Sequence, residues 1–208
     1  MVLDIGANLG GHLLPIAKLV GEKGKVYGFE GSQHAFQRQR KNVELNQYLS
    51  KRIKTYHAFL MENSNAEKPN QIYSSWPLNA KSKAQLHPVH LGQLHSVGEA
   101  EVFSIDEWSQ LEKPKRINLL KIDVDGYEIP VLRGCRKTIK KYRPIILLEL
   151  APYIHQERGY QFEELIKLLT DLKYGGKTLH GKTISLDTTI NTKIPRFGSL
   201  NVMLFPSS

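Results

Sequence analysis

Apolar and polar positions follow two kinds of pattern along the chain. Short apolar runs predict strands, and longer runs whose apolar positions recur every three to four residues predict helices. We expect strands at residues 2–5, 25–30, 52–60, 117–123 and 144–150, and helices at residues 11–20, 32–46, 127–141 and 162–172. The tail from 177 to 205 is expected to supply two more strands, the last at 200–205. This alternation indicates an α/β fold with a doubly wound, mostly parallel sheet of about seven strands.

A polar segment at about residues 62–98 interrupts this alternation. It is rich in Asn, Ser, Gln, Lys and His and has weak periodicity. Long irregular segments within a domain are uncommon and often functional. We therefore expect a single domain over residues 1–208, with an insertion that either covers a ligand site or decorates the surface. Because the first expected strand follows Met1 directly, we also expect a minimal or truncated form of the fold.

The turn after the first expected strand carries the first candidate chemistry. Residues 4–10 form a glycine-bearing loop that leads into a helix. Gly6 and Gly10 allow the backbone to approach a ligand closely, and Asn8 tolerates a left-handed conformation. Glu30 ends the second expected strand, twenty positions after Gly10. A carboxylate in that place can accept hydrogen bonds from both hydroxyls of a ribose.

Two classes of cofactor bind at turns of this kind. Dinucleotides favour the spacing Gly-x-Gly-x-x-Gly, whereas this loop has Gly6 and Gly10, with Asp4 two positions ahead of the first. The Asp4 carboxylate suits a ligand that carries an ammonium group. S-adenosylmethionine carries an ammonium group, a carboxylate, a sulfonium and a ribose. We therefore predict that it binds here in preference to NAD, through the following residues: Asp4, Gly6, Asn8, Gly10 and Glu30.

Two stretches of the sequence resemble the FkbM family of methyltransferases. The first joins the loop at residues 4–10 to Val-Tyr-Gly-Phe-Glu at residues 26–30. The second is more specific in order and spacing. It reads Leu-Leu-Lys-Ile-Asp-Val-Asp-Gly-Tyr-Glu at residues 119–128 and continues with Arg-Pro-Ile-Ile-Leu-Leu-Glu at residues 143–149. The resemblance covers about residues 2–150 apart from the polar insertion.

This resemblance implies a Rossmann-like class I methyltransferase that depends on S-adenosylmethionine. It also implies O-methylation, usually of a sugar or natural-product hydroxyl, so the expected acceptor is a small molecule or a glycan. The sequence departs from the family at two positions. Asp125 stands where the family usually has Glu, and Gly31 stands where it usually has Pro. Asp125 keeps the charge with a shorter reach, and Gly31 loosens a turn.

Asp123 and Asp125 are the candidate catalytic residues. They follow the fourth expected strand, and ligands of open parallel sheets bind at the carboxyl ends of the strands. An alcohol is a poor nucleophile near neutral pH, so a base or a metal must take its proton. Asp123 is the stronger candidate because it ends the strand. In the alternative interpretation, Asp125 and Gly126 form a turn, and Glu128 is a favourable charge at a helix N-terminus.

Metal ligation is the less favoured interpretation of these carboxylates. Asp123, Asp125 and Glu149 offer oxygen ligands of the kind that magnesium or calcium takes. Separate carboxylates explain the pattern more simply, and we predict no metal site. The other titratable candidates are three histidines of the insertion, interpreted as surface residues, and one histidine after the fifth strand that is a weak candidate for the substrate site: His87, His90, His95 and His155.

The charge of the chain leaves its class of partner open. The net charge is +9, and lysines and arginines gather in short clusters. We interpret the clusters as solvated surfaces, with attraction to an anionic partner such as nucleic acid as the alternative. No aromatic residues alternate with the clusters as in a base-stacking surface. Methylation of RNA or protein, and a non-catalytic cofactor-binding module, thus remain as alternative functions.

Cysteine content and hydropathy indicate the compartment. The single cysteine, Cys135, excludes an internal disulfide framework and a zinc site built from cysteines. No apolar run approaches the roughly 20 residues of a membrane span, and no secretory leader precedes the first strand. We therefore expect a reducing, cytoplasmic location.

Overall fold

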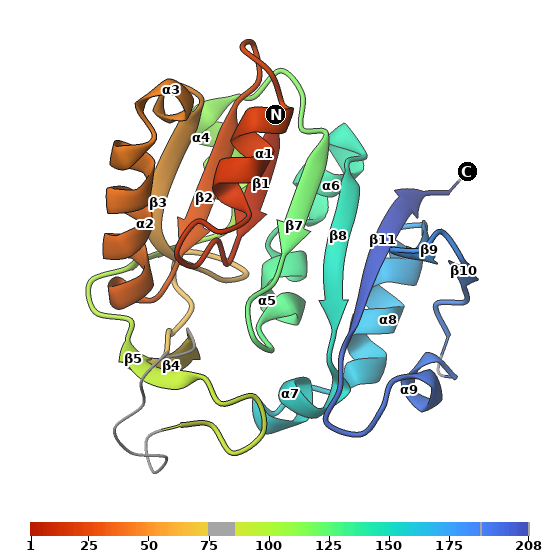
Figure 1. Ribbon diagram of the computed structural model, residues 1–208. Helices are drawn as coiled ribbons and strands as arrows, with labels where there is room; N and C mark the ends of the chain where they lie inside the picture. The colour runs from red at the N-terminus through yellow and green to blue at the C-terminus, as the bar shows by residue number, and fades with distance from the viewer. Residues whose placement is uncertain (75–85, 188, 208) are drawn as a thin grey trace.

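A sheet lies at the centre of the molecule in the computed structural model, which describes residues 1–74, 86–187 and 189–207 (Figure 1). The strands are β1 Val2–Ile5, β2 Val26–Glu30, β3 Ile53–Leu60, β4 Gln71–Ser74, β5 Gln93–Ser96, β6 Glu101–Phe103, β7 Leu119–Ile122, β8 Ile145–Leu150, β9 Tyr174–Thr178, β10 Thr183–Ile184 and β11 Leu200–Pro206. The helices are α1 Leu13–Leu19, α2 Gln33–Leu45, α3 Gln47–Ser50, α4 Ile105–Glu112, α5 Glu128–Arg133, α6 Arg136–Tyr142, α7 Pro152–Glu157, α8 Phe162–Asp171 and α9 Ile190–Lys193.

Within the described ranges the main sheet has nine strands in the order β10-β9-β11-β8-β7-β1-β2-β3-β6. Both neighbours of β1, namely β2 and β7, run parallel to it, and β11 is antiparallel to both β8 and β9. The predicted mostly parallel, doubly wound sheet is thereby confirmed. The two edge strands, β6 with three residues and β10 with two, are too short to leave a pattern in the sequence. Without them the sheet has the expected seven strands.

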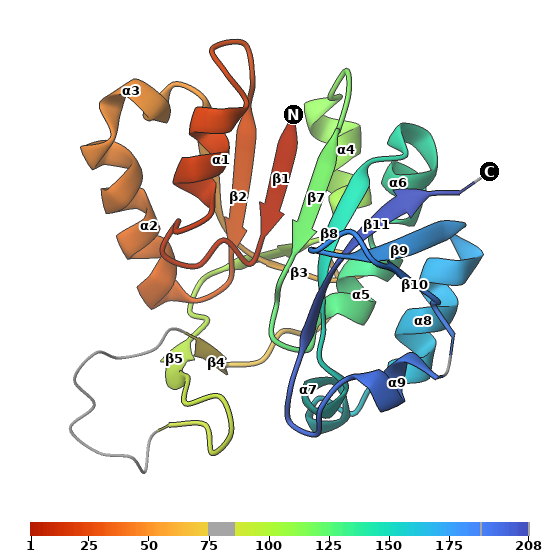
Figure 2. The same ribbon diagram turned by 45° about the vertical axis from the view of Figure 1, so that its right-hand side comes forward.

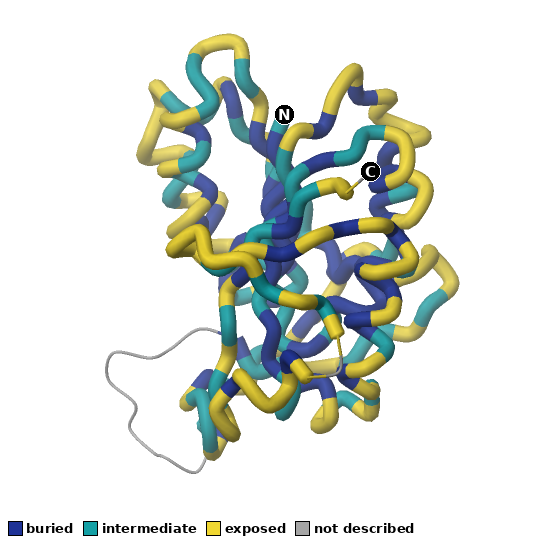
Figure 3. The backbone as a smooth tube through the Cα atoms, turned by 90° about the vertical axis from the view of Figure 1, so that its right-hand side faces the viewer, coloured by how far each residue is buried: buried dark blue, intermediate teal, exposed yellow. Residues whose placement is uncertain are grey.

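Helices cover both faces of this sheet (Figures 1 and 2). Helices α1 and α2 lie on one face over β1, β2 and β3, and α4, α5, α6 and α8 lie on the other. The central strands are buried along most of their length, whereas the connecting turns are exposed (Figure 3). No helix in the described ranges combines the length and the apolar character that a membrane span needs.

Local signals explain where several helices begin. Ser32 caps α2, because its hydroxyl accepts the N–H of Ala35. Helix α4 begins with a capping box, in which Ser104 and Glu107 each accept the other's backbone N–H. The sequence interpretation missed this helix, although the Ser-x-x-Glu spacing was visible.

The helix expected over residues 127–141 is divided into α5 and α6. The break falls at Gly134, whose carbonyl accepts the N–H of Asp106 at 2.8 Å. A Cβ atom on Gly134 would lie 2.3 Å from the carbonyl oxygen of Met61. The chain therefore bends where the backbones of three segments meet, a contact that the local sequence does not encode.

The described part of the polar insertion forms a small sheet of its own. Strands β4 and β5 pair antiparallel, apart from the main sheet. Part of the insertion, residues 75–85, lies outside the described residues. The interpretation of His87 as a surface residue is wrong, because its side chain is buried and its Nε2 lies 2.9 Å from a carboxylate oxygen of Glu157. The end of the insertion is thus held against α7.

Candidate functional site

A pocket opens where β1, β2, β3 and β7 end. Its empty space, counted out to open solvent, is about 490 Å³. Its walls include five residues singled out from the sequence: Gly6, Asn8, Glu30, Asp123 and Asp125. Apolar side chains and two residues of the insertion also line it: Phe29, Phe59, Tyr127, Ile72 and Ser74. The expected ligand edge of the sheet therefore holds a pocket.

The loop after β1 has the backbone conformation that its sequence predicts. Gly6, Asn8 and Gly10 have φ angles of 77°, 47° and 87°, all in the left-handed region. A Cβ atom on Gly6 would lie 1.8 Å from the carbonyl oxygen of Asp123. The loop and the end of β7 therefore meet backbone to backbone, and only glycine permits this approach.

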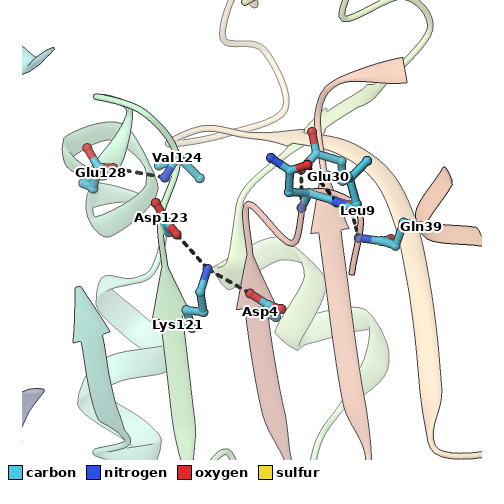
Figure 4. Close-up of polar contacts among 9 residues, drawn as sticks. Asp4, Leu9, Glu30, Gln39, Lys121, Asp123, Val124 and Glu128 are labelled. Atoms are coloured by element: carbon cyan, nitrogen blue, oxygen red, sulfur yellow. Dashed lines mark hydrogen bonds and ion pairs between the residues drawn. The ribbon is translucent and has the colours of Figure 1, made fainter. Parts of the chain in front are cut away.

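Glu30 is a buried carboxylate in the pocket wall. One of its oxygens accepts the N–H of Asn8 at 2.8 Å (Figure 4). The other accepts the N–H of Ser32 at 2.7 Å. Burial raises the pKa of Glu30 to about 7, although the two backbone donors act in the opposite direction. Each carboxylate oxygen has a second lone pair, so Glu30 can also accept hydrogen bonds from a hydroxylated ligand.

Lys121 links the first and fourth predicted strands (Figure 4). Its ammonium nitrogen lies 3.3 Å from a carboxylate oxygen of Asp4 and 3.1 Å from one of Asp123. Burial alone lowers the pKa of Lys121, but the two carboxylates outweigh it and the pKa is raised. Lys121 therefore stays charged inside the protein and fixes both acids.

This contact corrects the role expected for Asp4. The sequence interpretation directed its carboxylate at a ligand ammonium group. In the structure Asp4 is fully buried and does not line the pocket. It lies opposite Lys121, the residue of β7 with which it is paired in the sheet. The ammonium group that pairs with Asp4 belongs to the protein. Lys121 was missed, although a single lysine within an apolar strand was a visible signal.

The turn after β7 presents the two candidate catalytic acids. Asp125 and Gly126 have positive φ angles of 49° and 97°, so they form the turn proposed as the alternative interpretation. A carboxylate oxygen of Glu128 accepts the N–H of Val124 at 3.0 Å and holds this turn. Burial raises the pKa of Asp125 well above its ordinary value, and the carboxylate of Asp123 adds to this. Asp125 thus both shapes the turn and lines the pocket.

Two other candidates take supporting positions. His155 is fully buried, with its Nε2 3.4 Å from Glu128, so it does not face a substrate. Burial raises the pKa of Glu149, the Ser199 hydroxyl lowers it, and the Asp123 carboxylate raises it again. Among the described residues, no three His, Cys, Asp or Glu side chains are gathered closely enough to hold a metal ion, and this includes Asp123, Asp125 and Glu149.

The structure thus brings together most of the residues predicted to form the site. Gly6, Asn8, Glu30, Asp123 and Asp125 share one pocket. Gly10 does not line the pocket. It shapes the loop, because its N–H donates to the carbonyl of Ala7 at 2.9 Å. Asp4 lies behind the pocket, in contact with Lys121. The pocket therefore combines the glycine loop, which has no side chain at Gly6, with the carboxylates of Asp123 and Asp125.

Solved structures show the same fold. The methyltransferase FkbM from Methylobacillus flagellatus KT is 16% identical, with a TM-score of 0.57 over 98% of this chain and 43% of that chain. A candidate O-methyltransferase from Klebsiella pneumoniae is 14% identical, with a TM-score of 0.55 over 99% and 73%. The O-methyltransferase from Bacillus cereus is 15% identical, with a TM-score of 0.51 over 99% and 73%. The chain therefore spans less than half of the Methylobacillus protein.

Sequence comparison identifies the family. No curated protein matches the chain. The family model of the methyltransferase FkbM domain matches residues 4–175, which is most of the chain and includes both the glycine loop and the acidic turn. The chain therefore belongs to the FkbM family of methyltransferases.

Proposed function

We propose that the pocket binds S-adenosylmethionine and that the chain transfers its methyl group to a hydroxyl of a sugar, a glycan or another natural product. On this proposal residues 1–208 are one methyltransferase domain, with an insertion at about 62–98. One observation carries the proposal: the loop around Gly6, the Glu30 carboxylate and the Asp123 carboxylate are walls of the same pocket. The proposed site of the methyl donor and the proposed proton acceptor, Asp123, therefore line the same pocket.

The residues of the pocket fit this cofactor. A side chain on Gly6 would fill the cradle that the loop forms with β7. We expect Glu30 to accept hydrogen bonds from the ribose hydroxyls. The nearby acids suit a ligand with ammonium and sulfonium charges. We assign cofactor contacts to Gly6, Asn8 and Glu30, with Gly10 shaping the loop. Asp4 supports the site through Lys121.

Asp123 is the proposed general base. When bound, S-adenosylmethionine supplies an electrophilic methyl group on a positively charged sulfur. The Asp123 carboxylate would take the proton of the acceptor hydroxyl as that oxygen receives the methyl group. The side chain of Asp123 is 40% exposed, so an acceptor can reach it from the pocket mouth. Lys121 orients the carboxylate from behind.

The net charge of +9 supports a second candidate, methylation of RNA. Its test is the salt dependence of binding to a structured RNA, since phosphate contacts release counterions and the affinity falls steeply with salt. RNA binding with a steep salt dependence supports this candidate, and its absence supports a small-molecule or glycan acceptor. A binding module without activity would bind cofactor and transfer no methyl group to any acceptor.

Glu30→Ala is expected to weaken S-adenosylmethionine binding by about tenfold to a hundredfold. The change removes a charge-assisted contact to the ribose, which is worth roughly 1.5–3 kcal/mol. Isothermal titration calorimetry on the full chain measures the effect. The matched control is Glu22→Ala, because Glu22 is an exposed glutamate in the turn after α1.

The Glu30 assignment and the wider proposal fail in different ways. Equal affinity in Glu30→Ala and in the wild-type chain would contradict the role of Glu30 alone. No binding of S-adenosylmethionine or S-adenosylhomocysteine by the wild-type chain would contradict the proposed function. Mass spectrometry of the purified chain for bound S-adenosylhomocysteine, followed by an acceptor screen, completes the test.

Cofactor affinity is also expected to rise about tenfold between pH 6 and pH 8. The pKa of Glu30 is raised by burial to about 7. Its protonated form therefore predominates below that pH, and the stronger acceptor, the ionised carboxylate, is lost as the pH falls. Calorimetry at several pH values measures the slope, and Glu30→Gln should abolish the part that Glu30 contributes. An unchanged slope would assign the titration to another group, such as Glu128, whose pKa burial also raises to about 7.

A further inference from the structure

A second hollow opens between α7, the start of α8 and the turn that follows α9. It encloses about 1110 Å³ up to open solvent. We call it the α7–α9 groove, and the lining residues used below are Tyr153, Gln156, Tyr160, Asn191, Arg196 and Phe197. The cofactor and catalytic assignments above use none of them.

The groove lies at the same edge of the sheet as the candidate catalytic acids, because β7 and β8 are parallel and α7 follows the end of β8. Leu150, at the end of β8, pairs with Leu200, at the start of β11. The two walls of the groove, α7 and the turn after α9, therefore leave the sheet side by side (Figure 1). Burial raises the pKa of Tyr153, and the carboxylates of Glu149 and Asp125 raise it further, so this groove residue lies within electrostatic range of the acidic turn.

The lining combines aromatic rings with planar polar groups. Tyr153, Tyr160 and Phe197 supply the rings, and Gln156 and Asn191 supply amides that both donate and accept hydrogen bonds. Of the fully charged side chains in the lining, one is a cation, Arg196, and one is an anion, Glu163. The two charges balance, so the lining has no net charge that would favour an anionic ligand.

Phe197 is held in an unfavourable conformation at the mouth of the groove. Its φ of 61° lies in the left-handed region, which bulky residues rarely adopt. The ring is 52% exposed, so burial does not account for its position. Its centroid lies 6.0 Å from that of Tyr153, and the Arg196 guanidinium covers the ring at 4.9 Å. Strained residues of this kind concentrate at ligand sites.

We propose that the α7–α9 groove binds the acceptor of the methyl transfer, and that the bound group is an uncharged ring rich in hydroxyls, such as a sugar residue. The inference rests on the proposed function and deepens it. The apolar C–H face of such a ring packs against the Phe197 and Tyr153 rings. Its hydroxyls exchange hydrogen bonds with the amides of Gln156 and Asn191, and one hydroxyl reaches Asp123.

The variant Phe197→Asn tests the contact between the Phe197 ring and the ligand without disturbing the fold of the turn. Asparagine adopts positive φ readily, so the turn is kept while the ring is lost. Phe197→Tyr keeps the ring and serves as the rescue. The matched control is Tyr48→Asn, because Tyr48 is 72% exposed on α3, away from the groove.

The probes are the methyl glycosides of glucose, mannose and rhamnose with their disaccharides, and a ten-nucleotide RNA. Saturation-transfer NMR on the full chain with S-adenosylhomocysteine, at about 10 mM sugar, detects sites of millimolar affinity. At least one sugar is expected to bind, with affinity reduced about fivefold or more in Phe197→Asn and retained in Phe197→Tyr and Tyr48→Asn. The thermal midpoint of Phe197→Asn should stay within a few degrees of wild type.

Three outcomes would overturn the proposal: no sugar of the panel binds, sugar binding does not depend on Phe197, or the RNA binds in a manner that depends on Phe197. Failure of the proposed function looks different. In that case the sugar still binds in the groove, while calorimetry on the same sample detects no binding of S-adenosylmethionine. Phe197→Asn should leave cofactor affinity unchanged, whereas Glu30→Ala should reduce it.

Discussion

Replacing Asp123 with asparagine is expected to lower methyl transfer by about a hundredfold or more, the usual scale for losing a general base. Asparagine keeps the shape of the side chain and cannot accept the proton of the acceptor hydroxyl. Lys121 retains Asp4 as a partner at 3.3 Å, so the strands should stay paired. Cofactor affinity should change little, because the assigned cofactor contacts lie on the loop after β1 and on Glu30.

The comparison variant is Asp125→Asn, which should have a smaller effect. Burial and the neighbouring carboxylates raise the pKa of Asp125, which favours the protonated form that asparagine imitates. Methyl transfer to a confirmed acceptor is measured alongside cofactor binding on the same preparation. Full activity in Asp123→Asn would assign the base to Asp125 or Glu149. Loss of cofactor binding would instead place Asp123 in the cofactor site.

Gly6→Ala is expected to destabilise the chain by about 2–5 kcal/mol and to abolish cofactor binding. The new Cβ would lie 1.8 Å from the carbonyl oxygen of Asp123, and backbone atoms cannot turn aside as a flexible side chain can. Adopting φ of 77° costs alanine roughly 1–2 kcal/mol, and overpacking adds about 1–3 kcal/mol. Urea unfolding of the full chain measures the loss.

Two neighbouring glycines provide graded controls for this substitution. At Gly10 φ is 87°, but the nearest atom to a new Cβ is a side-chain carbon of Gln39 at 3.5 Å. Gly10→Ala should therefore cost about 1–2 kcal/mol, the conformational part alone. Gly11 has no atom within 4 Å of a new Cβ, and Gly11→Ala should be neutral. Equal stability of Gly6→Ala and Gly11→Ala would show that the loop and β7 do not meet as described.

The sequence predicts those parts of the molecule whose structure depends on local periodicity. Strand β1 has the expected bounds, and each end of α2 lies within one residue of its expected position. The features that were missed depend on partners far along the chain. The break at Gly134 reflects the Met61 carbonyl, and the burial of His155 reflects its contact with Glu128 on another helix.

The candidate site follows the same division. Gly6, Asn8 and Glu30 could be assigned because turn chemistry and strand ends are local features. The partner of Asp4 could not, because the pairing of Asp4 with Lys121 depends on the register between β1 and β7. Strand order is set by burial across the sheet, and one sequence does not show which charged residues it brings opposite each other.

The position of β11 has a consequence for how the chain is made. Strand β11 is paired with β8 on one side and β9 on the other, yet its residues, Leu200–Pro206, are synthesised after both. Until the ribosome has released them, the outer edge of β8 and the near edge of β9 have unsatisfied backbone donors and acceptors. Such edges pair readily with other chains. Slow translation or premature termination before Leu200 should therefore yield aggregates rather than a smaller folded domain.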